Sequence, residues 1–177
     1  MTNLIIANII SLFSAIFTCL SSWSKKKANI YYFQIGQCLL LAVANIFFQS
    51  YAAIISLLIC ALRNYLCAKD KYTKPLCIIL TVAILILGII CNNKGYIGWI
   101  FIGANVIYTL GVYFCKKELS IKVNILINLI LWIIYEILII DIPSFIADTI
   151  ATVITVIAIF RYFYERRKNN DNLNRGQ

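Results

Sequence analysis

The chain has 177 residues, of which 62% are hydrophobic and only 13% are charged, and its formal net charge is +9. Soluble domains are nearer about half apolar with about a quarter of their residues charged, so this composition excludes an ordinary soluble protein and predicts a polytopic membrane protein. Basic cytoplasmic loops explain the positive charge better than nucleic-acid binding does. The seven Cys form no CxxC pair and His is absent, so we expect neither a metal site nor a cofactor.

Seven apolar segments follow one another along the chain, each close to the roughly 20 residues that a helix needs to cross a bilayer. They cover residues 3–21, 30–48, 51–67, 75–91, 97–115, 121–140 and 143–161. The runs are too long, and lack the alternation, expected of barrel strands. We therefore predict an all-α membrane protein with seven transmembrane helices, followed by a basic, disordered tail over residues 163–177.

The basic residues give the predicted orientation. Of the 16 Lys and Arg residues, all but Lys94 fall in the loops after the first, third and fifth segments, at their edges, or at the C-terminal end. Lys and Arg avoid translocated loops, so the N-terminus is predicted outside and the C-terminus in the cytoplasm. Arg63 and Arg161 lie at predicted cytoplasmic helix ends, where we interpret them as snorkelling anchors.

Polar residues recur at helical spacing within the first, second, sixth and seventh segments. The four sets are Asn8, Ser11, Thr18 and Ser22; Gln34, Gln37 and Asn45; Asn124, Asn128, Trp132 and Glu136; and Asp148, Thr152 and Thr155. Spacings of three and four place each set on one helix face. Such a face turns toward other helices or water in hydrocarbon. The sets either line a polar path or join helices through hydrogen bonds.

The fourth segment is almost wholly apolar inside, with only Thr81 and Gly88 as exceptions. We interpret residues 68–96 as a linker helix with its loops between two triple-helix bundles, residues 1–67 and 97–162. Corresponding polar positions in the two bundles are Asn8 and Asn105, Gln37 and Asn128, Asn45 and Glu136, and Arg63 and Arg161. This pattern predicts a 3+1+3 architecture of parallel repeats, as in some transporters.

The stretch YEILIIDIPSFIAD, residues 135–148, carries three acids between apolar flanks. Pro143 is placed to begin the seventh helix, which makes Asp141 a charge of an external loop. Glu136 and Asp148 then lie about one turn below the outer surface. They are either tolerated near-interface charges or, with Asn45, an outer entrance that holds a substrate hydroxyl, a cation or a proton.

The amides near mid-depth suggest a site for a neutral polar ligand, because they offer both donors and acceptors. The candidate binding residues are Asn8, Gln37, Asn105 and Asn128, with Trp132 either stacking on a solute ring or packing in the core. We expect a facilitator for a small solute such as a sugar or nucleoside. A receptor, scaffold or effector that transports nothing is the alternative, and an enzyme is not expected because GxSxG and HExxH are absent.

Several motifs also resemble a known family. These are ALRNYL, YFCKKELSIK, WIIYE, and SFIAD running on to FRYF. Through them residues 1–168 resemble the YgjV family of bacterial inner-membrane proteins, which implies a location in the bacterial inner membrane. More distantly, the 3+1+3 arrangement is similar to PQ-loop proteins, SWEET sugar facilitators and PnuC-type nicotinamide-riboside transporters. Their Pro-Gln pair is absent, since neither Pro75 nor Pro143 precedes Gln.

Overall fold

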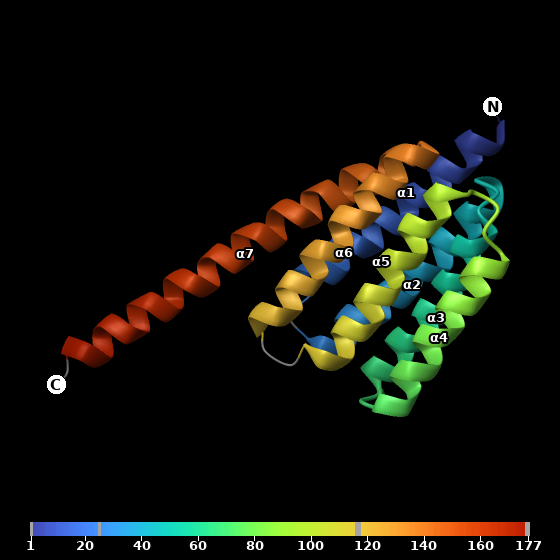
Figure 1. Ribbon diagram of the computed structural model, residues 1–177. Helices are drawn as coiled ribbons and strands as arrows, with labels where there is room; N and C mark the ends of the chain where they lie inside the picture. Colours follow the sequence, from blue (N-terminus) through green and yellow to red (C-terminus); the bar gives the residue numbers. More distant parts are fainter. Residues whose placement is uncertain (1, 25, 116–117, 176–177) are drawn as a thin grey trace.

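The computed structural model describes residues 2–24, 26–115 and 118–175, which form seven helices and no strand (Figure 1). The helices are α1 (Thr2–Trp23), α2 (Lys27–Phe47), α3 (Tyr51–Ala68), α4 (Lys74–Ile90), α5 (Tyr96–Phe114), α6 (Glu118–Ile139) and α7 (Ile142–Arg175). The all-helical prediction is confirmed. Six of these helices are long and apolar enough to cross a membrane, while α4 is shorter at 17 residues. Lys25, Lys116 and Lys117 of the predicted cytoplasmic loops, and the side chain of Ser22, lie outside the described part.

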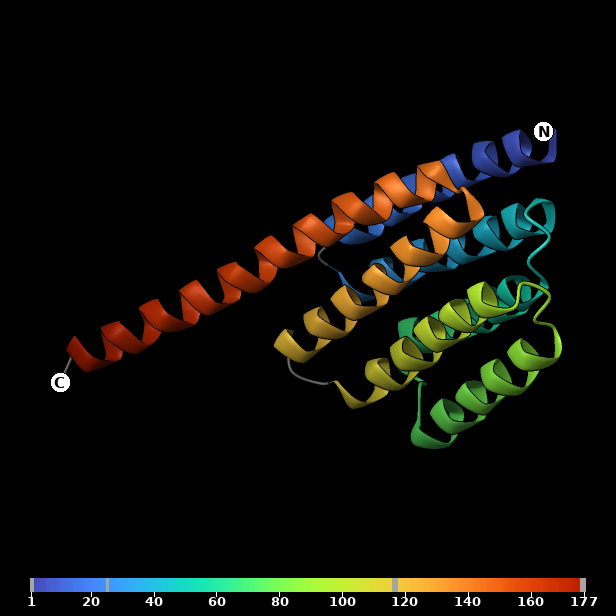
Figure 2. The same ribbon diagram turned by 45° about the horizontal axis from the view of Figure 1, so that its top comes forward.

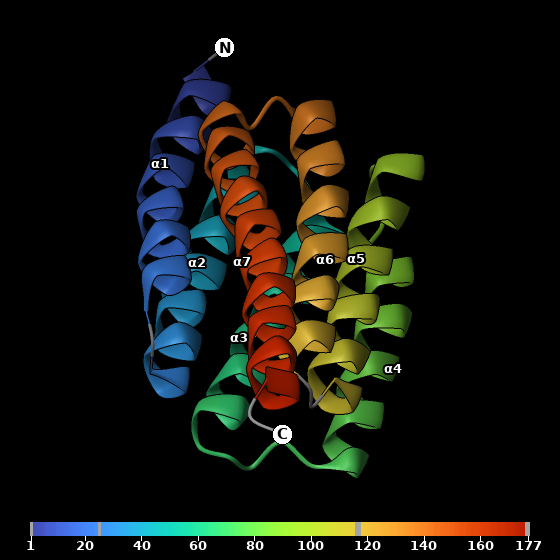
Figure 3. The same ribbon diagram turned by 90° about the vertical axis from the view of Figure 1, so that its left-hand side faces the viewer.

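Six helices form a closed ring in which each packs against two neighbours. The order around the ring is α1, α2, α3, α5, α6, α7 and back to α1. The fourth helix packs outside the ring, against α3 and α5. Figures 2 and 3 show α4 on one flank of the bundle and α7 beside α1 on the other. The ring therefore has an interior that side chains from six helices reach.

The helices bury polar side chains and expose apolar ones. On α1, Ser11, Ser14 and Thr18 are buried, whereas Phe13 and Ile16 are at least half exposed. This is the reverse of a water-soluble bundle, and it is the arrangement that an apolar solvent favours. The backbone hydrogen bonds of a helix interior are made within that helix, as hydrocarbon requires. Embedding in a lipid bilayer follows from this distribution.

Two ends of the bundle are distinguished below. The α1–α2, α3–α4 and α5–α6 connections lie at one end, which we call the basic end because Lys26, Lys69 and Lys71 are there. The α2–α3, α4–α5 and α6–α7 connections lie at the other, which we call the N-terminal end because α1 begins there.

The α2–α3 and α6–α7 turns at the N-terminal end have the same geometry. In each, a residue with positive φ ends the helix, Gln49 (56°) or Ile140 (62°). The next N–H then donates to a carbonyl five residues back, from Ser50 to Asn45 at 3.0 Å and from Asp141 to Glu136 at 2.9 Å. These are Schellman caps. Their equivalent residues are 91 positions apart in the sequence.

The C-terminal segment departs from the sequence prediction. The helix α7 continues to Arg175, well beyond the other helices, where the sequence predicted disorder from residue 163 (Figure 1). No Gly or Pro interrupts the chain between Pro143 and Gly176, and without a breaker the helix continues past its apolar part.

Candidate functional site

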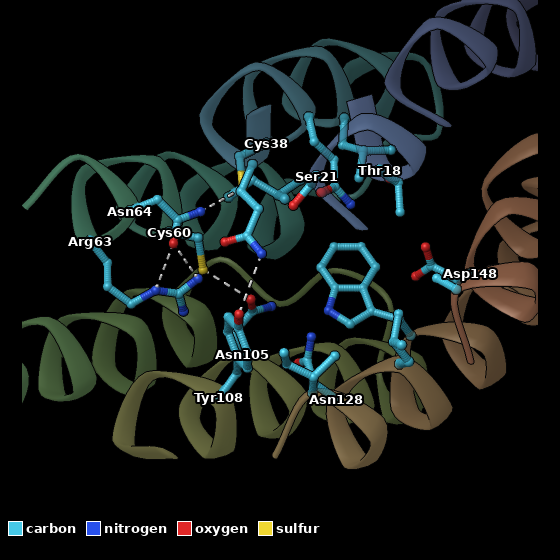
Figure 4. Close-up of a pocket in the computed structure, with 18 of the residues that line it drawn as sticks. Thr18, Ser21, Cys38, Cys60, Arg63, Asn64, Asn105, Tyr108, Asn128 and Asp148 are labelled. Atoms are coloured by element: carbon cyan, nitrogen blue, oxygen red, sulfur yellow. Dashed lines mark hydrogen bonds between the residues drawn. The ribbon is translucent and has the colours of Figure 1, made fainter. Parts of the chain in front are cut away.

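The ring encloses a polar cavity of about 100 Å³, room for a few water molecules. Side chains from all six ring helices line it, and none from α4 does (Figure 4). The lining residues are Thr18, Ser21, Gln34, Gln37, Cys38, Leu41, Leu57, Cys60, Arg63, Asn64, Asn105, Tyr108, Ile125, Asn128, Leu129, Trp132, Asp148, Ala151 and Thr155.

The lining positions are paired along the sequence. On α2 and α6, and on α3 and α7, a shift of 91 residues takes one lining position to another, as from Gln37 to Asn128 and from Leu57 to Asp148. On α1 and α5 the shift is 87, as from Thr18 to Asn105. Every lining residue has such a counterpart except Arg63. The pairing expected for Gln37 and Asn128 agrees with this register, whereas that of Asn8 with Asn105 does not.

Three of the predicted binding amides, Gln37, Asn105 and Asn128, reach the cavity. The Nδ2 of Asn105 donates to the Phe101 carbonyl at 3.0 Å, and its Oδ1 accepts from the Cys60 thiol at 3.0 Å. The Oδ1 of Asn128 is buried without a hydrogen-bond partner. A buried amide oxygen without a partner is costly, so this atom is available to a donor on a molecule in the cavity.

Trp132 both lines the cavity and packs in the core. Its ring meets Phe101 edge-on with centroids 4.8 Å apart, and Tyr135 lies 6.2 Å away. Edge-to-face contacts of this kind hold aromatic rings firmly. Trp132 therefore packs in the core and also borders the cavity, and its stacking on a solute ring stays a prediction.

Arg63 is buried in the cavity wall, with 2% of its surface exposed. Its Nε and Nη2 donate to Asn64 Oδ1 at 3.2 and 3.0 Å, and its Nη1 donates to Thr109 Oγ1 at 2.9 Å. The guanidinium carbon lies 4.6 Å from the centre of the Tyr108 ring. The interpretation of Arg63 as a snorkelling anchor is wrong, because the side chain turns toward α5 instead of the interface. Arg161, its expected counterpart, is exposed.

A thin partition separates this cavity from a second one nearer the basic end. The second cavity, of about 230 Å³, is lined by Tyr31, Gly111 and other residues of α2, α5 and α6. The two cavities share Gln34, Tyr108 and Ile125. Gln34 Nε2 donates to the Tyr108 hydroxyl at 3.5 Å, a long hydrogen bond, and Gln34 Oε1 is buried without a partner. This long hydrogen bond and the contact of Arg63 with the Tyr108 ring hold the partition in place.

A buried polar layer closes the cavity toward the N-terminal end. The Tyr135 hydroxyl lies 2.9 Å from both Asn45 Oδ1 and Ser50 Oγ. Tyr135, Asn45 and Ser50 are each 1% exposed. Asn45, predicted at an outer entrance, is thus part of a seal between α2, α3 and α6.

Three carboxyl groups gather beside this seal. Glu136 on α6 and Asp148 on α7 are neighbours within hydrogen-bonding reach and are 2% and 4% exposed. Glu136 Oε2 is buried without a hydrogen-bond partner. Two buried carboxyls in contact cannot both be ionised without strong repulsion, so the pair is suited to hold a proton. The described residues contain no cluster of three or more His, Cys, Asp or Glu side chains arranged to hold a metal ion.

Asp141 lies in the α6–α7 turn but is only 2% exposed. The Ser11 hydroxyl donates to its Oδ2 at 2.8 Å and the Ser144 N–H to its Oδ1 at 3.3 Å. Burial raises the pKa of the Asp141 carboxyl, and the hydrogen bonds from Ser11 and Ser144 partly offset this. The interpretation of Asp141 as an external loop charge is wrong, because α1 covers the turn.

Asn8, the fourth predicted binding amide, does not line the cavity. Its Nδ2 donates to the Ile140 carbonyl at 3.2 Å and its Oδ1 accepts from the Ile142 N–H at 3.1 Å, so it holds the α6–α7 turn. Asn93 does the same for the α2–α3 turn, through the Gln49 carbonyl at 2.6 Å and the Tyr51 N–H at 3.1 Å. Each asparagine thus bridges a Schellman turn that belongs to the opposite half of the chain.

Sequence reasoning missed several lining residues, above all Arg63, Asn64 and Cys60 on α3. Their spacing in the sequence could have indicated this, because these residues follow Leu57 at helical spacing. They lie on the face of α3 that carries the buried Ser56 and Ala53. Cys60 lies within an apolar run, so nothing in the sequence marked the thiol that donates to Asn105. Arg63 was hidden by its place near a helix end.

Comparison with known protein families assigns the chain to one of them. A family model described as a bacterial inner membrane protein, Imp-YgjV, matches residues 5–166. No curated protein and no solved structure matches the chain. The matched region contains the six ring helices up to the end of the apolar part of α7, together with the whole cavity lining. The chain therefore belongs to the Imp-YgjV family and is a multi-pass protein of the bacterial inner membrane.

Proposed function

We propose that this protein is a membrane transporter of the facilitator type, which carries a small polar solute through the centre of the helix ring. The observation that carries this proposal is the cavity itself. Its lining comes from every ring helix, and it is polar in a chain whose outer surface is apolar. Polar groups inside a membrane protein mark solute pathways more often than chance.

The proposed architecture is two parallel triple-helix repeats, α1–α3 and α5–α7, joined by α4 as a seventh span. The shift of 91 residues between lining positions and the paired Schellman turns support a repeat. The order of contacts does so too, since α3 meets α5 as α7 meets α1. An odd number of spans between equivalent helices gives both repeats one orientation. This is the arrangement that suggests SWEET-like and PnuC-like transporters.

The basic end is proposed to face the cytoplasm, because Lys and Arg are retained there. The solute would then enter from outside past Asn45, Glu136 and Asp148, and bind at Gln37, Asn105, Asn128 and Trp132. In the state described here the outer side is sealed by the Tyr135 layer. Toward the basic end, Gln34, Tyr108 and Ile125 separate the polar cavity from the second cavity. Rocking of the two repeats would open the cavity to the outer side and close it to the inner side.

Uptake into proteoliposomes tests the proposal. A panel of labelled sugars, nucleosides and small carboxylates should contain at least one solute that enters faster than into empty liposomes. Asn128→Ala should slow the uptake of this solute about tenfold. The Asn128 Oδ1 has no hydrogen-bond partner in the protein, so its removal costs a contact with the solute and breaks no hydrogen bond of that oxygen. Glu136→Gln should also slow uptake, by removing the carboxyl pair.

The matched control is Gly103→Ala, since a methyl group at Gly103 meets open space and should leave uptake unchanged. Wild-type uptake equal to that of empty liposomes for the whole panel would contradict transport. Unchanged uptake in both Asn128→Ala and Glu136→Gln would remove these residues from the mechanism.

One observation favours a second candidate function, that of a receptor, scaffold or effector. The helix α7 runs beyond the bundle, and Arg166 and Arg167 on it are exposed. A basic helix beside a membrane attracts anionic lipids or an acidic partner. Removal of residues 166–177 would leave solute uptake intact if the protein transports, and would abolish a role that depends on this segment.

A further inference from the structure

Arg63 breaks the paired pattern of the cavity. The position 91 residues further on holds Ile154, which is 46% exposed on the outer surface. Asp148 is a second exception, because it is a carboxyl group whose counterpart is the apolar Leu57. Thus one repeat contributes a cation to the cavity and the other contributes a carboxyl group. A fold built from two similar halves does not require either charge.

The surroundings of Arg63 supply dipoles but no opposite charge. Its hydrogen bonds go to the Asn64 amide oxygen and the Thr109 hydroxyl, and its face lies on the Tyr108 ring. Within the ranges that the structure describes, no carboxylate forms an ion pair with it. A guanidinium stays protonated, and a buried charge without a counter-ion is costly. An anion in the cavity would supply the opposite charge.

The distribution of charge across the cavity indicates where that anion binds. Figure 4 shows Arg63 and Asp148 on opposite sides, with Asn105 and Asn128 between them. An anion is therefore attracted to the α3 side and repelled from the α7 side when Asp148 is ionised. Near Arg63, the amides of Asn64 and Asn105 also border the cavity, and amide N–H groups are donors to an anion.

We propose that the cavity binds a small organic carboxylate, with Arg63 as its counter-ion. This deepens the proposed transport function and rests on it for the route by which the ligand enters. One guanidinium balances one negative charge, and its planar fork matches a carboxylate. A phosphate carries nearly two charges at neutral pH and is less well balanced. The solute then differs in class from the neutral sugar or nucleoside that the amides alone suggested.

The test is a binding measurement on the full chain in detergent. In the variant Trp23→Phe, Trp99→Phe, the only tryptophan is Trp132, which lines the cavity and whose fluorescence reports an occupant. The probes are sodium acetate and its neutral isostere acetamide, at millimolar concentration, with inorganic phosphate as a third probe and sodium chloride holding the ionic strength constant. Acetate should change the fluorescence with saturation. Acetamide should bind at least about tenfold more weakly.

Arg63→Gln in the same background should weaken acetate binding about tenfold or more and leave the weak acetamide response unchanged. Arg63→Lys keeps the charge but loses the planar fork, so its affinity for acetate should lie between those of the parent and of Arg63→Gln. Arg161→Gln removes an exposed arginine and should bind acetate as well as its parent. If Arg63→Gln does not fold, the comparison of acetate with acetamide on the parent decides.

The proposal is overturned if acetate gives no response, if acetamide binds equally well, or if Arg161→Gln loses as much as Arg63→Gln. Binding of phosphate in preference to acetate overturns the choice of a carboxylate. The proposals of transport and of anion binding can be contradicted separately. Charge-selective binding without uptake in proteoliposomes would contradict the facilitator alone. Uptake of neutral solutes that Arg63→Gln leaves unchanged would contradict the carboxylate site alone.

Discussion

At the scale of single residues, side chains of one type have different roles at different depths in the bundle. Asn8 and Asn105 are both asparagines within apolar segments, and the sequence placed them together. In the register of the cavity lining, the counterpart of Asn105 on α1 is Thr18, ten residues beyond Asn8, a difference of about 15 Å along a helix. That displacement brings Asn8 to a turn at the membrane surface and Asn105 to the cavity. Polarity of a residue was predictable from the sequence, but its partner depends on packing.

Asp141 makes stability depend on pH. Because burial raises its pKa above the ordinary 3.8, the folded protein binds this proton more tightly than the unfolded chain does. Its contribution is most favourable below pH 3.8 and is lost as the pH rises through the folded-state pKa. Thermal unfolding in detergent across this range should show Asp141→Asn gaining stability relative to wild type as the pH rises.

Ser11→Ala serves as the comparison, because the Ser11 hydroxyl donates to Asp141 and favours its ionised form. This variant should lose more stability with rising pH than wild type does. Glu136 and Asp148, the carboxyl groups nearest to Asp141, are present in all three proteins. A difference between wild type and Asp141→Asn that does not change with pH would contradict the burial argument.

At the scale of helices, the existence of each element followed from its apolar run, since hydrocarbon leaves the backbone no alternative to a helix. The limits of α3 and α5 were predicted to within one residue. The face of α3 that carries Arg63 was not predicted, because an arginine near a helix end satisfies the snorkelling rule equally well from outside. The length of α7 was missed because polarity argues against burial, not against helical structure.

The contact between α5 and α6 depends on Gly111. A Cβ placed there would overlap the Asn124 amide, whereas one at Gly103 on the same helix would meet nothing. Gly111→Ala should therefore destabilise the protein by about 1–3 kcal/mol, the usual cost of overpacking. Gly103→Ala should be neutral or slightly stabilising. Thermal melts of both variants check this, and equal melting temperatures would show that α6 yields without cost.

At the scale of the whole molecule, the two halves are joined at the N-terminal end by the reciprocal contacts of Asn8 and Asn93. In the proposed transport cycle, opening at this end would require both to separate from their turns. Asn8→Ala with Asn93→Ala removes the four hydrogen bonds to these turns. At roughly 0.6 kcal/mol each in a membrane protein, their loss should raise the population of the proposed outward-open state more than tenfold.

The accessibility of Cys60 measures that shift. Cys60 lines the cavity and is 2% exposed. With the other six cysteines replaced by alanine, a membrane-impermeant thiol reagent applied outside cells should label Cys60 slowly in the parent. It should label the double variant several-fold faster, and each single variant at an intermediate rate. Equal labelling rates would mean that these asparagines do not hold the outer side closed.

The contact between α7 and α1 has a consequence for biogenesis. Six helices are synthesised before α7, and until α7 inserts the ring has a gap beside α1. Ser11 and the amide of Asn8 lack their final acceptors and donors during that interval, because these lie in the α6–α7 turn. Nascent chains halted before residue 141 should therefore expose polar groups to lipid, which makes them natural clients for membrane-embedded chaperones and proteases.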